Sequence, residues 1–315
     1  MKILITGGAG YLGTTLVPLL LKRGDEVIVF DLLRFGIQPL IPFCCNPRFS
    51  LVRGDIRDRR SIETPARKAD AVVHLAAIVG HPACAAAPQE AQTVNVDGTR
   101  NLAAVLGRGR PVVFASTSSC YGSVPEGTCD EDTPLRPVSL YGTTKARCET
   151  ILLDSCDAVV CRIATAYGLS PRLRLDLLIN NFVHRALHEH RIALYQPAAR
   201  RSFLHVHDAA RAVVMALEQP GSMIGRAFNV GHESQNMTKM DVCRAIREII
   251  PGVEIDDSAT AEDPDHRDYV VSYARMGALG FSPTHTIPEG IHELVRALRW
   301  IGCRDAFGNM AVEPA

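Results

Sequence analysis

The sequence lacks the long apolar runs and the excess of one charge that mark two large classes of protein. None of its apolar runs approaches the roughly 20 residues that cross a bilayer. Lysine and arginine together number 34, and so do aspartate and glutamate, so the chain has no basic excess of the kind that binds nucleic acid. We therefore expect neither a membrane nor a nucleic acid among its partners.

Cysteine is plentiful, but the cysteine spacing of metal sites is absent. None of the ten cysteines forms a C-x-x-C pair, although Cys44 and Cys45 are adjacent. We therefore expect no metal site and interpret the cysteines as reduced packing residues. An apolar run begins already at Lys2, which leaves no room for a signal peptide, so we expect a cytoplasmic protein.

Four glycines follow directly behind this first apolar run: Gly7, Gly8, Gly10 and Gly13. Residues 2–6 predict a buried strand, and residues 11–23 have helical spacing with Gly24 as the cap. Glycine inside regular structure costs stability, so the cluster indicates a sharp turn with a closely approaching ligand. Because the free amides of a helix N-terminus bind phosphate, the turn predicts a pyrophosphate site.

An acidic residue, Asp31, ends the next predicted strand at residues 26–30. A carboxylate at this distance behind the glycine turn can accept hydrogen bonds from the two hydroxyls of a ribose. The same carboxylate would repel a 2′-phosphate. The pattern therefore predicts NAD rather than NADP as the cofactor.

Strand and helix patterns alternate through the first half of the chain. Further strands are expected at residues 49–53, 71–74, 112–116 and 158–163, and helices at about 61–68, 88–106 and 141–154. This alternation predicts an α/β protein with a doubly wound parallel sheet, the Rossmann fold, and ligands at the carboxyl ends of its strands.

The alternation fades beyond Tyr167. We expect residues 1–165 and about 200–232 to form the NAD-binding domain. Residues of about 166–199 and 233–315 are expected to form a smaller C-terminal substrate-binding lobe. Within these boundaries, segments 202–206 and 227–230 are expected to be strands that return to the main sheet.

Tyr141 and Lys145 are four residues apart on a predicted helix, so their side chains share one face. A free tyrosine has a pKa near 10 and is a poor base at neutral pH. A lysine cation and a positive nicotinamide ring beside it both favour the phenolate and lower this pKa. The pair therefore predicts a base that takes a proton from a sugar hydroxyl while a hydride leaves the same carbon.

Several motifs in order make the chain similar to a known family. They are TGGAGYLG, Asp31, GDI at residues 54–56, HLAA at 74–77, NVDGTRNL at 95–102, STSSCYG at 116–122 and YGTTK at 141–145. Together they resemble the extended short-chain dehydrogenases/reductases, and more narrowly the NAD-dependent nucleotide-sugar epimerases and dehydratases. The resemblance runs from residue 1 to about residue 280.

The resemblance implies a role for each matched position. Thr117, Tyr141 and Lys145 are the implied catalytic residues. The implied NAD-binding residues are Gly7, Gly10, Tyr11, Leu12, Gly13, Asp31, Asp55, Ile56, Leu75, Ala76, Ala77, Tyr141, Lys145 and Tyr167. The implied substrate-binding residues are His81, Thr117, Ser118, Asn180, Asn181, Arg201 and Arg267, with both arginines on the nucleotide diphosphate. His81 fits a surface loop equally well.

The positions after Thr117 bear on which reaction the resemblance implies. The family's 4,6-dehydratases carry an Asp-Glu pair there and its decarboxylases a glutamate at the second position, whereas this chain has Ser118 and Ser119. What remains is the machinery of an epimerase that acts most often at C4 of a nucleotide-diphospho-sugar. A dehydratase or reductase of the same family and a non-catalytic NAD-sensing protein stay as alternatives. The resemblance also implies a homodimer.

Overall fold

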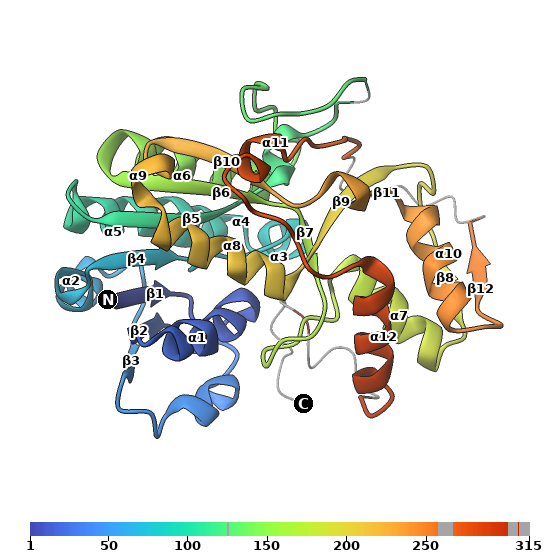
Figure 1. The fold of residues 1–315 in the computed structure, drawn as a ribbon, viewed down its shortest axis with the longest axis horizontal. Coiled ribbons are helices and arrows are strands. Elements are labelled where there is room, and N and C mark those ends of the chain that lie inside the picture. Colours follow the sequence, from blue (N-terminus) through green and yellow to red (C-terminus); the bar gives the residue numbers. More distant parts are fainter. Residues whose placement is uncertain (125, 258–266, 302–307, 309–315) are drawn as a thin grey trace.

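Seven parallel strands form the main sheet of the protein, for which we use a computed structural model that describes residues 1–124, 126–257, 267–301 and 308. The strands are β1 (Lys2–Thr6), β2 (Glu26–Asp31), β3 (Phe49–Arg53), β4 (Ala71–His74), β5 (Pro111–Thr117), β6 (Asp157–Ile163) and β10 (Arg226–Val230). Their order is β10-β6-β5-β4-β1-β2-β3 (Figure 1). The order reverses between β1 and β4, which is where such sheets bind ligands.

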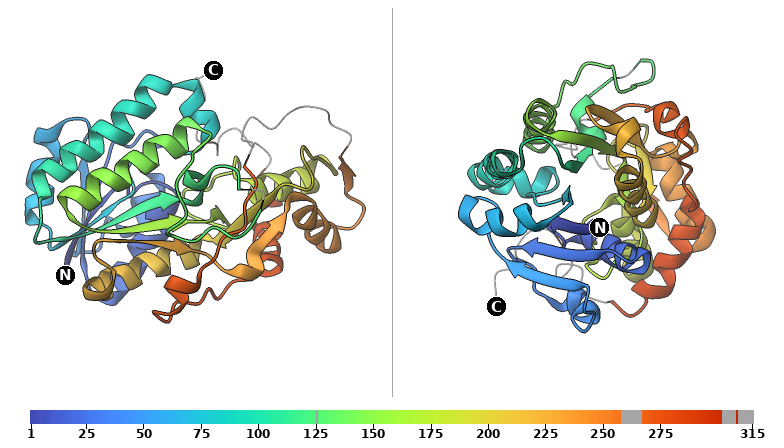
Figure 2. Two further views of the ribbon diagram at one scale, coloured as in Figure 1. Left: turned by 90° about the horizontal axis from the view of Figure 1, so that it is seen from above. Right: turned by 60° about the vertical axis from the view of Figure 1, so that its left-hand side comes forward.

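Helices cover both faces of this sheet (Figure 2). On one face, α1 (Tyr11–Arg23) packs against α8 (Val206–Glu218). On the other face lie α2 (Arg59–Lys68), α5 (Gly98–Leu106) and α6 (Leu140–Ser155), which pack in that order. The short helices α3 (His81–Ala86) and α4 (Pro88–Ala91) precede α5, and a π-helical segment (Gln92–Asp97) connects α4 to it.

The apolar pattern of the strands explains the two faces. Ile3 and Ile5 of β1 belong to the core beneath α1 and α8, whereas Leu4 belongs to the core beneath α2, α5 and α6. Successive side chains of a strand point to opposite faces, so a continuous apolar strand buries both. The predicted doubly wound fold is therefore confirmed.

The remaining elements build a second, smaller lobe with its own core. It contains a three-stranded sheet in the order β11-β9-β7, from β7 (Thr165–Tyr167), β9 (Arg200–His205) and β11 (Asn236–Thr238). A second pair joins β8 (Arg191–Ala193) to β12 (Glu254–Asp256). The helices of the lobe are α7 (Leu178–His188), α10 (Lys239–Ile249) and α12 (Ile287–Leu298). The short helices α9 (Pro220–Met223) and α11 (Ala274–Gly277) and the 3-10 turns η1 (Gln38–Phe43), η3 (Ser118–Tyr121) and η4 (Glu233–Gln235) complete the described elements.

One of the two expected returning strands is confirmed and the other is wrong. The segment at 227–230 lies in β10 and pairs with β6 at the edge of the main sheet. The segment at 202–206 falls largely in β9, which pairs with β7 and β11 of the lobe instead. The chain re-enters the main body only afterwards, through α8.

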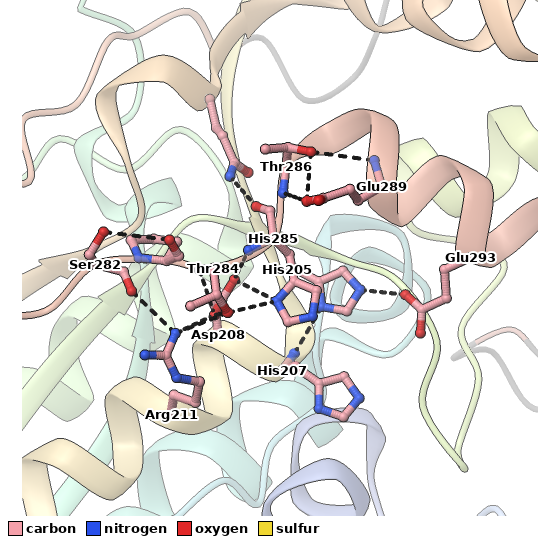
Figure 3. Close-up of polar contacts among 12 residues, drawn as sticks. His205, His207, Asp208, Arg211, Ser282, Thr284, His285, Thr286, Glu289 and Glu293 are labelled. Carbon is pink, nitrogen blue, oxygen red and sulfur yellow. Dashed lines mark hydrogen bonds and ion pairs between the residues drawn. The ribbon is translucent and has the colours of Figure 1, made fainter.

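Stacked imidazole rings mark the point where β9, α8 and α12 meet (Figure 3). The rings of His205 and His285 stack with centroids 4.2 Å apart, and His207 lies parallel to His205 at 5.5 Å. The Nδ1 atom of the buried His205 accepts a hydrogen bond from the backbone N–H of His207 at 3.3 Å. Its other nitrogen, Nε2, therefore carries the proton and donates to Glu293 of α12 at 2.6 Å.

A buried carboxylate, Asp208, ties the segment before α12 to α8 (Figure 3). It accepts the backbone N–H groups of Thr284 and His285 at 3.1 and 2.9 Å and forms an ion pair with Arg211 at 2.7 Å. Asp208 lies in the first turn of α8, where a negative charge also favours the helix. The lobe is thus attached to the main body by hydrogen-bonded and charged groups.

None of the helices in the part of the chain that the structure describes has the length and apolar character needed to span a bilayer.

Candidate active site

A cavity of about 340 Å³ opens at the carboxyl ends of the main strands. Its walls come from the glycine turn, from the ends of β2, β4, β5 and β6, from α6 and from the lobe segment at 172–177. Most of the predicted site residues line it: Gly7, Gly10, Tyr11, Leu12, Gly13, Asp31, Asp55, Ile56, Leu75, Ala76, Ala77, His81, Thr117, Tyr141, Lys145 and Arg267. The fold therefore brings segments far apart in the sequence to one cavity.

The glycine turn has a geometry that only glycine satisfies. Gly7 has a φ of +72°, and a Cβ atom added to it would lie 2.6 Å from the backbone nitrogen of Ala76. A Cβ on Gly13 would lie 2.6 Å from the Cα of Gly8, so the first turn of α1 packs directly on the loop. Gly10 caps α1 without a side-chain hydrogen bond, which leaves the first amides of the helix for an anion. This cradle fits a pyrophosphate.

Asp31 is held in place by the loop around it. Its two carboxylate oxygens accept the backbone N–H groups of Ala9 at 2.9 Å and Leu33 at 2.7 Å. Each oxygen has a second lone pair, so the carboxylate can still accept two ribose hydroxyls. Burial raises the pKa of Asp31, whereas the two amides lower it. The residues that line the cavity at this end fit a dinucleotide.

Further side chains line the dinucleotide end of the cavity. The guanidinium of Arg57 donates hydrogen bonds to both carboxylate oxygens of Asp55, the shortest at 2.5 Å. These bonds lower the pKa of Asp55. The guanidinium of Arg172 lies over the ring of Phe35 at 4.2 Å, and both residues line the cavity. The sequence analysis missed Arg172 and Phe35, because no spacing rule links the two segments.

Tyr141 and Lys145 both reach the cavity from the first two turns of α6. The helix begins behind Ser139, whose hydroxyl accepts the N–H of Gly142 at 3.1 Å. The side chain of Lys145 is nearly fully buried, and its ammonium lies 4.2 Å from the centre of the Phe114 ring on β5. The cap and the strand therefore fix where the phenol and the ammonium enter the cavity.

The charges around Tyr141 include groups that the sequence did not indicate. Burial raises the pKa of the Tyr141 phenol, and the nearby thiols of Cys120 and Cys84 add to this effect. Arg174 and Arg267 lower this pKa. Lys145 is itself buried, and burial lowers the pKa of its ammonium. Two arginines of the lobe thus contribute positive charge beside the phenol, and the sequence did not indicate this part of their role.

Thr117 ends β5 and faces the same cavity. Its hydroxyl donates to the hydroxyl of Ser119 at 3.0 Å and accepts the Ser119 N–H at 3.1 Å. Arg267 of the lobe donates to the same Ser119 hydroxyl. The predicted diphosphate-binding arginine and the predicted catalytic threonine are therefore joined through Ser119. The four residues before Arg267 in the sequence, Asp263 to His266, lie outside the described residues.

Five predicted site residues do not line the cavity. Ser118 is buried and donates to the backbone oxygens of Arg162 and Ile163. Tyr167 is fully buried in the core of the lobe, where its ring meets that of His205 at 5.3 Å. Neither side chain lines the cavity, and sequence similarity alone cannot show which way a side chain points.

The other three are Asn180, Asn181 and Arg201, which bind the protein backbone. The amide of Asn180 bonds with both backbone groups of Gly168, and Asn181 donates to the oxygen of Leu175. The buried Arg201 donates to the backbone oxygens of Arg200 and Arg267. Arg201 therefore supports the segment that carries Arg267 instead of facing the cavity.

His81 lies on the wall of the cavity at the start of α3. Its Nδ1 atom is buried and has no hydrogen-bond partner among the residues that the structure describes. A Cβ added to the neighbouring Gly80 would lie 3.7 Å from Nη2 of Arg174, whose guanidinium donates to Asp176 at 3.1 Å. Arg174 lines the cavity although the sequence analysis missed it; the arginine-rich segment behind Tyr167 was the available signal.

Three comparisons describe what the chain is similar to. The family model described as the NAD dependent epimerase/dehydratase family matches residues 3–231. A dTDP-glucose 4,6-dehydratase from Actinoplanes sp. is 32% identical, with 94% of this chain and 97% of the relative covered. UDP-glucuronic acid decarboxylase 1 from Arabidopsis thaliana is 30% identical, with 95% of this chain and 70% of the relative covered.

A solved structure extends the comparison to the fold. The UDP-glucose 4-epimerase of Thermus thermophilus, in complex with NAD, is 29% identical and superposes with a TM-score of 0.82. The match covers 96% of this chain and the whole of that chain.

Proposed function

Because the chain belongs to the NAD-dependent epimerase/dehydratase family, we propose that it epimerises a nucleotide-diphospho-sugar, at C4, through a transient ketone. Its cofactor is NAD, in accordance with the family and with the NAD-bound neighbour. NAD, when bound, accepts a hydride from the sugar carbon and returns it to the ketone. The cradle of Gly7, Gly10 and Gly13 and the carboxylate of Asp31 fit this cofactor.

The observation that carries the proposal is the chemistry of the wall formed by β5 and α6. This wall presents hydroxyls and one ammonium: Ser116, Thr117, Ser119, Ser139, Tyr141 and Lys145. The carboxylates among the described lining residues are Asp31, Asp55 and Glu90, which come from the ends of β2 and β3 and from α4. Elimination of a 6-hydroxyl needs a side-chain acid near the reacting carbons, and this wall supplies none.

The side chains of the wall fit the steps of an epimerisation. Tyr141, as the phenolate, takes the proton of the sugar hydroxyl as the hydride leaves the same carbon. Thr117 shares a hydrogen bond with the reacting oxygen, and the positive charge of Arg174 and Arg267 favours the phenolate. When the ketone is presented with its other face, Tyr141 returns the proton as the hydride is restored. Tyr141 therefore ends each cycle as the phenolate in which it began, with no net gain or loss of a proton.

The substrate end of the cavity is positively charged, which suits the diphosphate of a nucleotide sugar. Arg174 and Arg267 line this end beside Tyr141, and Arg267 reaches the hydroxyl of Ser119. The planar fork of arginine binds phosphate oxygens in pairs. We assign Arg267 to the diphosphate and His81, whose buried Nδ1 lacks a hydrogen-bond partner among the described residues, to the sugar.

The test is to incubate the purified protein with UDP-, GDP-, CDP- and dTDP-sugars and to follow the products by NMR. An epimer at C4, with its hydrogen retained and without net NADH, is the expected result. A 4-keto-6-deoxy sugar, loss of CO₂ or stoichiometric NADH would instead assign the chain to a dehydratase, a decarboxylase or a reductase. NAD binding without turnover of any of these sugars would leave a sensing protein.

A further inference from the structure

A buried carboxylate, Glu149, lies behind the reactive wall and has no part in the roles given above. It follows Lys145 by one turn of α6 and Tyr141 by two. Only 3% of Glu149 is exposed, and it is not among the residues that line the cavity. A buried charge is expensive unless it is paired and hydrogen-bonded, so its partners matter.

Glu149 joins α6 to two strands of the main sheet. The hydroxyl of Ser116 on β5 donates a hydrogen bond to the Glu149 carboxylate. Ser116 directly precedes Thr117 in the chain. Arg162 on β6 donates to the same carboxylate through Nε at 3.1 Å and through Nη2 at 2.8 Å. The helix that carries Tyr141 and Lys145 is thus bonded to the strand that carries Thr117.

Arg162 extends these bonds to the far side of Thr117. Its Nη1 atom donates to the hydroxyl of Tyr121 and to the backbone oxygen of Glu131, both at 3.1 Å. The Tyr121 hydroxyl donates in turn to Asn229 of β10 at 2.7 Å. Because Ser116 and Tyr121 flank Thr117 and Ser119, the segment with the reactive hydroxyls is held at both ends.

Glu149 also contributes charge to the surroundings of Lys145. Several groups face the Lys145 ammonium: Cys148 and Glu149 on its own helix, Cys120 on η3, Cys84 on α3, and His74 on β4. Burial raises the pKa of Cys120 to about 12 and that of Cys84 to about 11, and it raises the pKa of Cys148 as well. Burial lowers the pKa of His74 to about 3. These groups are neutral at pH 7, so Glu149 supplies the negative charge of this set.

We propose that Glu149 is a positioning residue for the reaction: through Ser116 it fixes Thr117 relative to Tyr141, and it places a carboxylate one helical turn beyond Lys145 on α6. The positioning of Thr117 affects turnover, so this part of the inference rests on the proposed function. The charge beside Lys145 affects NAD binding alone, because Lys145 is expected to hold the ribose hydroxyls of the cofactor; we call this the electrostatic part.

Glu149→Gln tests the charge while keeping the shape of the side chain. Without the carboxylate, the pKa of Lys145 falls further, so the alkaline loss of NAD affinity should move by about one unit to lower pH. Titration calorimetry of the full chain with NAD between pH 7 and 10 measures this shift. Glu63→Gln is the matched control, since Glu63 lies on α2 with 41% of its side chain exposed and pairs with Arg67 one turn further along.

Ser116→Ala tests the positioning without changing any charge. We expect kcat to fall about fivefold, the size of one ordinary hydrogen bond, with KM and the alkaline limb unchanged. A folded Glu149→Gln variant with an unmoved alkaline limb would overturn the electrostatic part. Wild-type kcat in Ser116→Ala would overturn the positioning part, even if Glu149→Gln did not fold.

The two failures can be told apart. If the wild-type protein turns over no nucleotide sugar, the proposed function fails. The shift in the pH dependence of NAD binding is then still expected, and its absence counts against Glu149 alone.

Discussion

At the scale of single residues, the reactive wall places a phenol that burial keeps protonated next to arginines that oppose this effect. The pKa of Tyr141 is raised by burial and lowered by Arg174 and Arg267. A positive ring bound against the phenol would act in the same direction as the arginines. We therefore expect the pKa of Tyr141 to fall when the positively charged cofactor ring binds beside it.

Tyr141→Phe should abolish most turnover and spare cofactor binding. The substitution removes the proton carrier but leaves the ring, so we expect kcat to fall by about 10²–10⁴, or roughly 3–5 kcal/mol. The glycine turn and Asp31 are untouched, so NAD affinity should survive. Thr117→Val should cost less, because it removes a hydrogen bond and no proton carrier. Near-normal kcat in Tyr141→Phe would contradict the mechanism.

Asp31 should make the protein prefer NAD to NADP. Its carboxylate is fixed by the N–H groups of Ala9 and Leu33, and a 2′-phosphate would meet a like charge at this place. We expect affinities that differ by at least about tenfold, or about 1.4 kcal/mol. Titration of the wild-type protein with each dinucleotide measures the ratio, and equal affinities would refute this role of Asp31.

At the scale of elements, the turn between β1 and α1 is the part of the site with the least freedom. Gly7→Ala places a Cβ 2.6 Å from the backbone of Ala76 and forces a side chain into a left-handed conformation. We expect the free energy of unfolding to fall by about 2 kcal/mol or more, with loss of NAD binding.

Gly221→Ala is the matched control for this substitution. Gly221 lies on α9, and a Cβ there has no neighbour within 4 Å. We expect its free energy of unfolding to change by at most about 0.5–1 kcal/mol, and in the stabilising direction. Chemical denaturation of both variants gives the comparison. Equal stability of the two would show that the close approach at Gly7 is tolerated.

The elements of the first half could be predicted from the sequence because their cause is local. Apolar runs, glycine caps and helical spacing gave β1, α1 and β2 to within a residue, and the cavity follows from the topology. The partner of β9 could not be predicted, since an apolar strand pattern does not say which sheet it joins. Tyr167 and Asn180 do not line the cavity, because their side chains point to His205 and Gly168. The sequence pattern does not say which way a side chain points.

At the scale of the whole molecule, His207 at the junction makes stability depend on pH. Burial, and then the neighbouring His205, lower the pKa of His207 in the folded protein. The unfolded chain therefore binds more protons than the folded one below the ordinary histidine pKa of about 6.5. Stability is complete above this pH and is lost as the pH falls toward the lower pKa of the folded state.

His207→Gln should therefore reduce the slope of the stability profile between about pH 7 and pH 5, and the slope that remains is the part contributed by the buried His74. The measurement is the free energy of unfolding by urea at several pH values. His292→Gln, an exposed histidine on α12, is the control and should keep the slope of the wild type. A slope that is unchanged in His207→Gln would place the acid sensitivity elsewhere.

The whole molecule is also predicted to pair with a second copy. The π-helical segment, α5 and α6 carry apolar side chains that are only partly buried. They include Val94, Val105, Ile151 and Leu153. We expect these helices to meet across a two-fold axis. Light scattering at micromolar concentration should give twice the chain mass of 34.3 kDa. A monomer mass would contradict the homodimer.

The position of β10 at the edge of the main sheet bears on the order in which the protein folds during synthesis. A ribosome that has released the first 165 residues has delivered six of the seven strands, but neither α8 nor β10. At that moment β6 is an open edge, and α1 lacks the helix that packs against it. Folding of the cofactor domain must therefore wait for about 65 more residues, roughly 3–13 seconds of synthesis. A chain cut at residue 165 should aggregate rather than bind NAD, although it contains the glycine turn, Asp31 and all three reactive side chains.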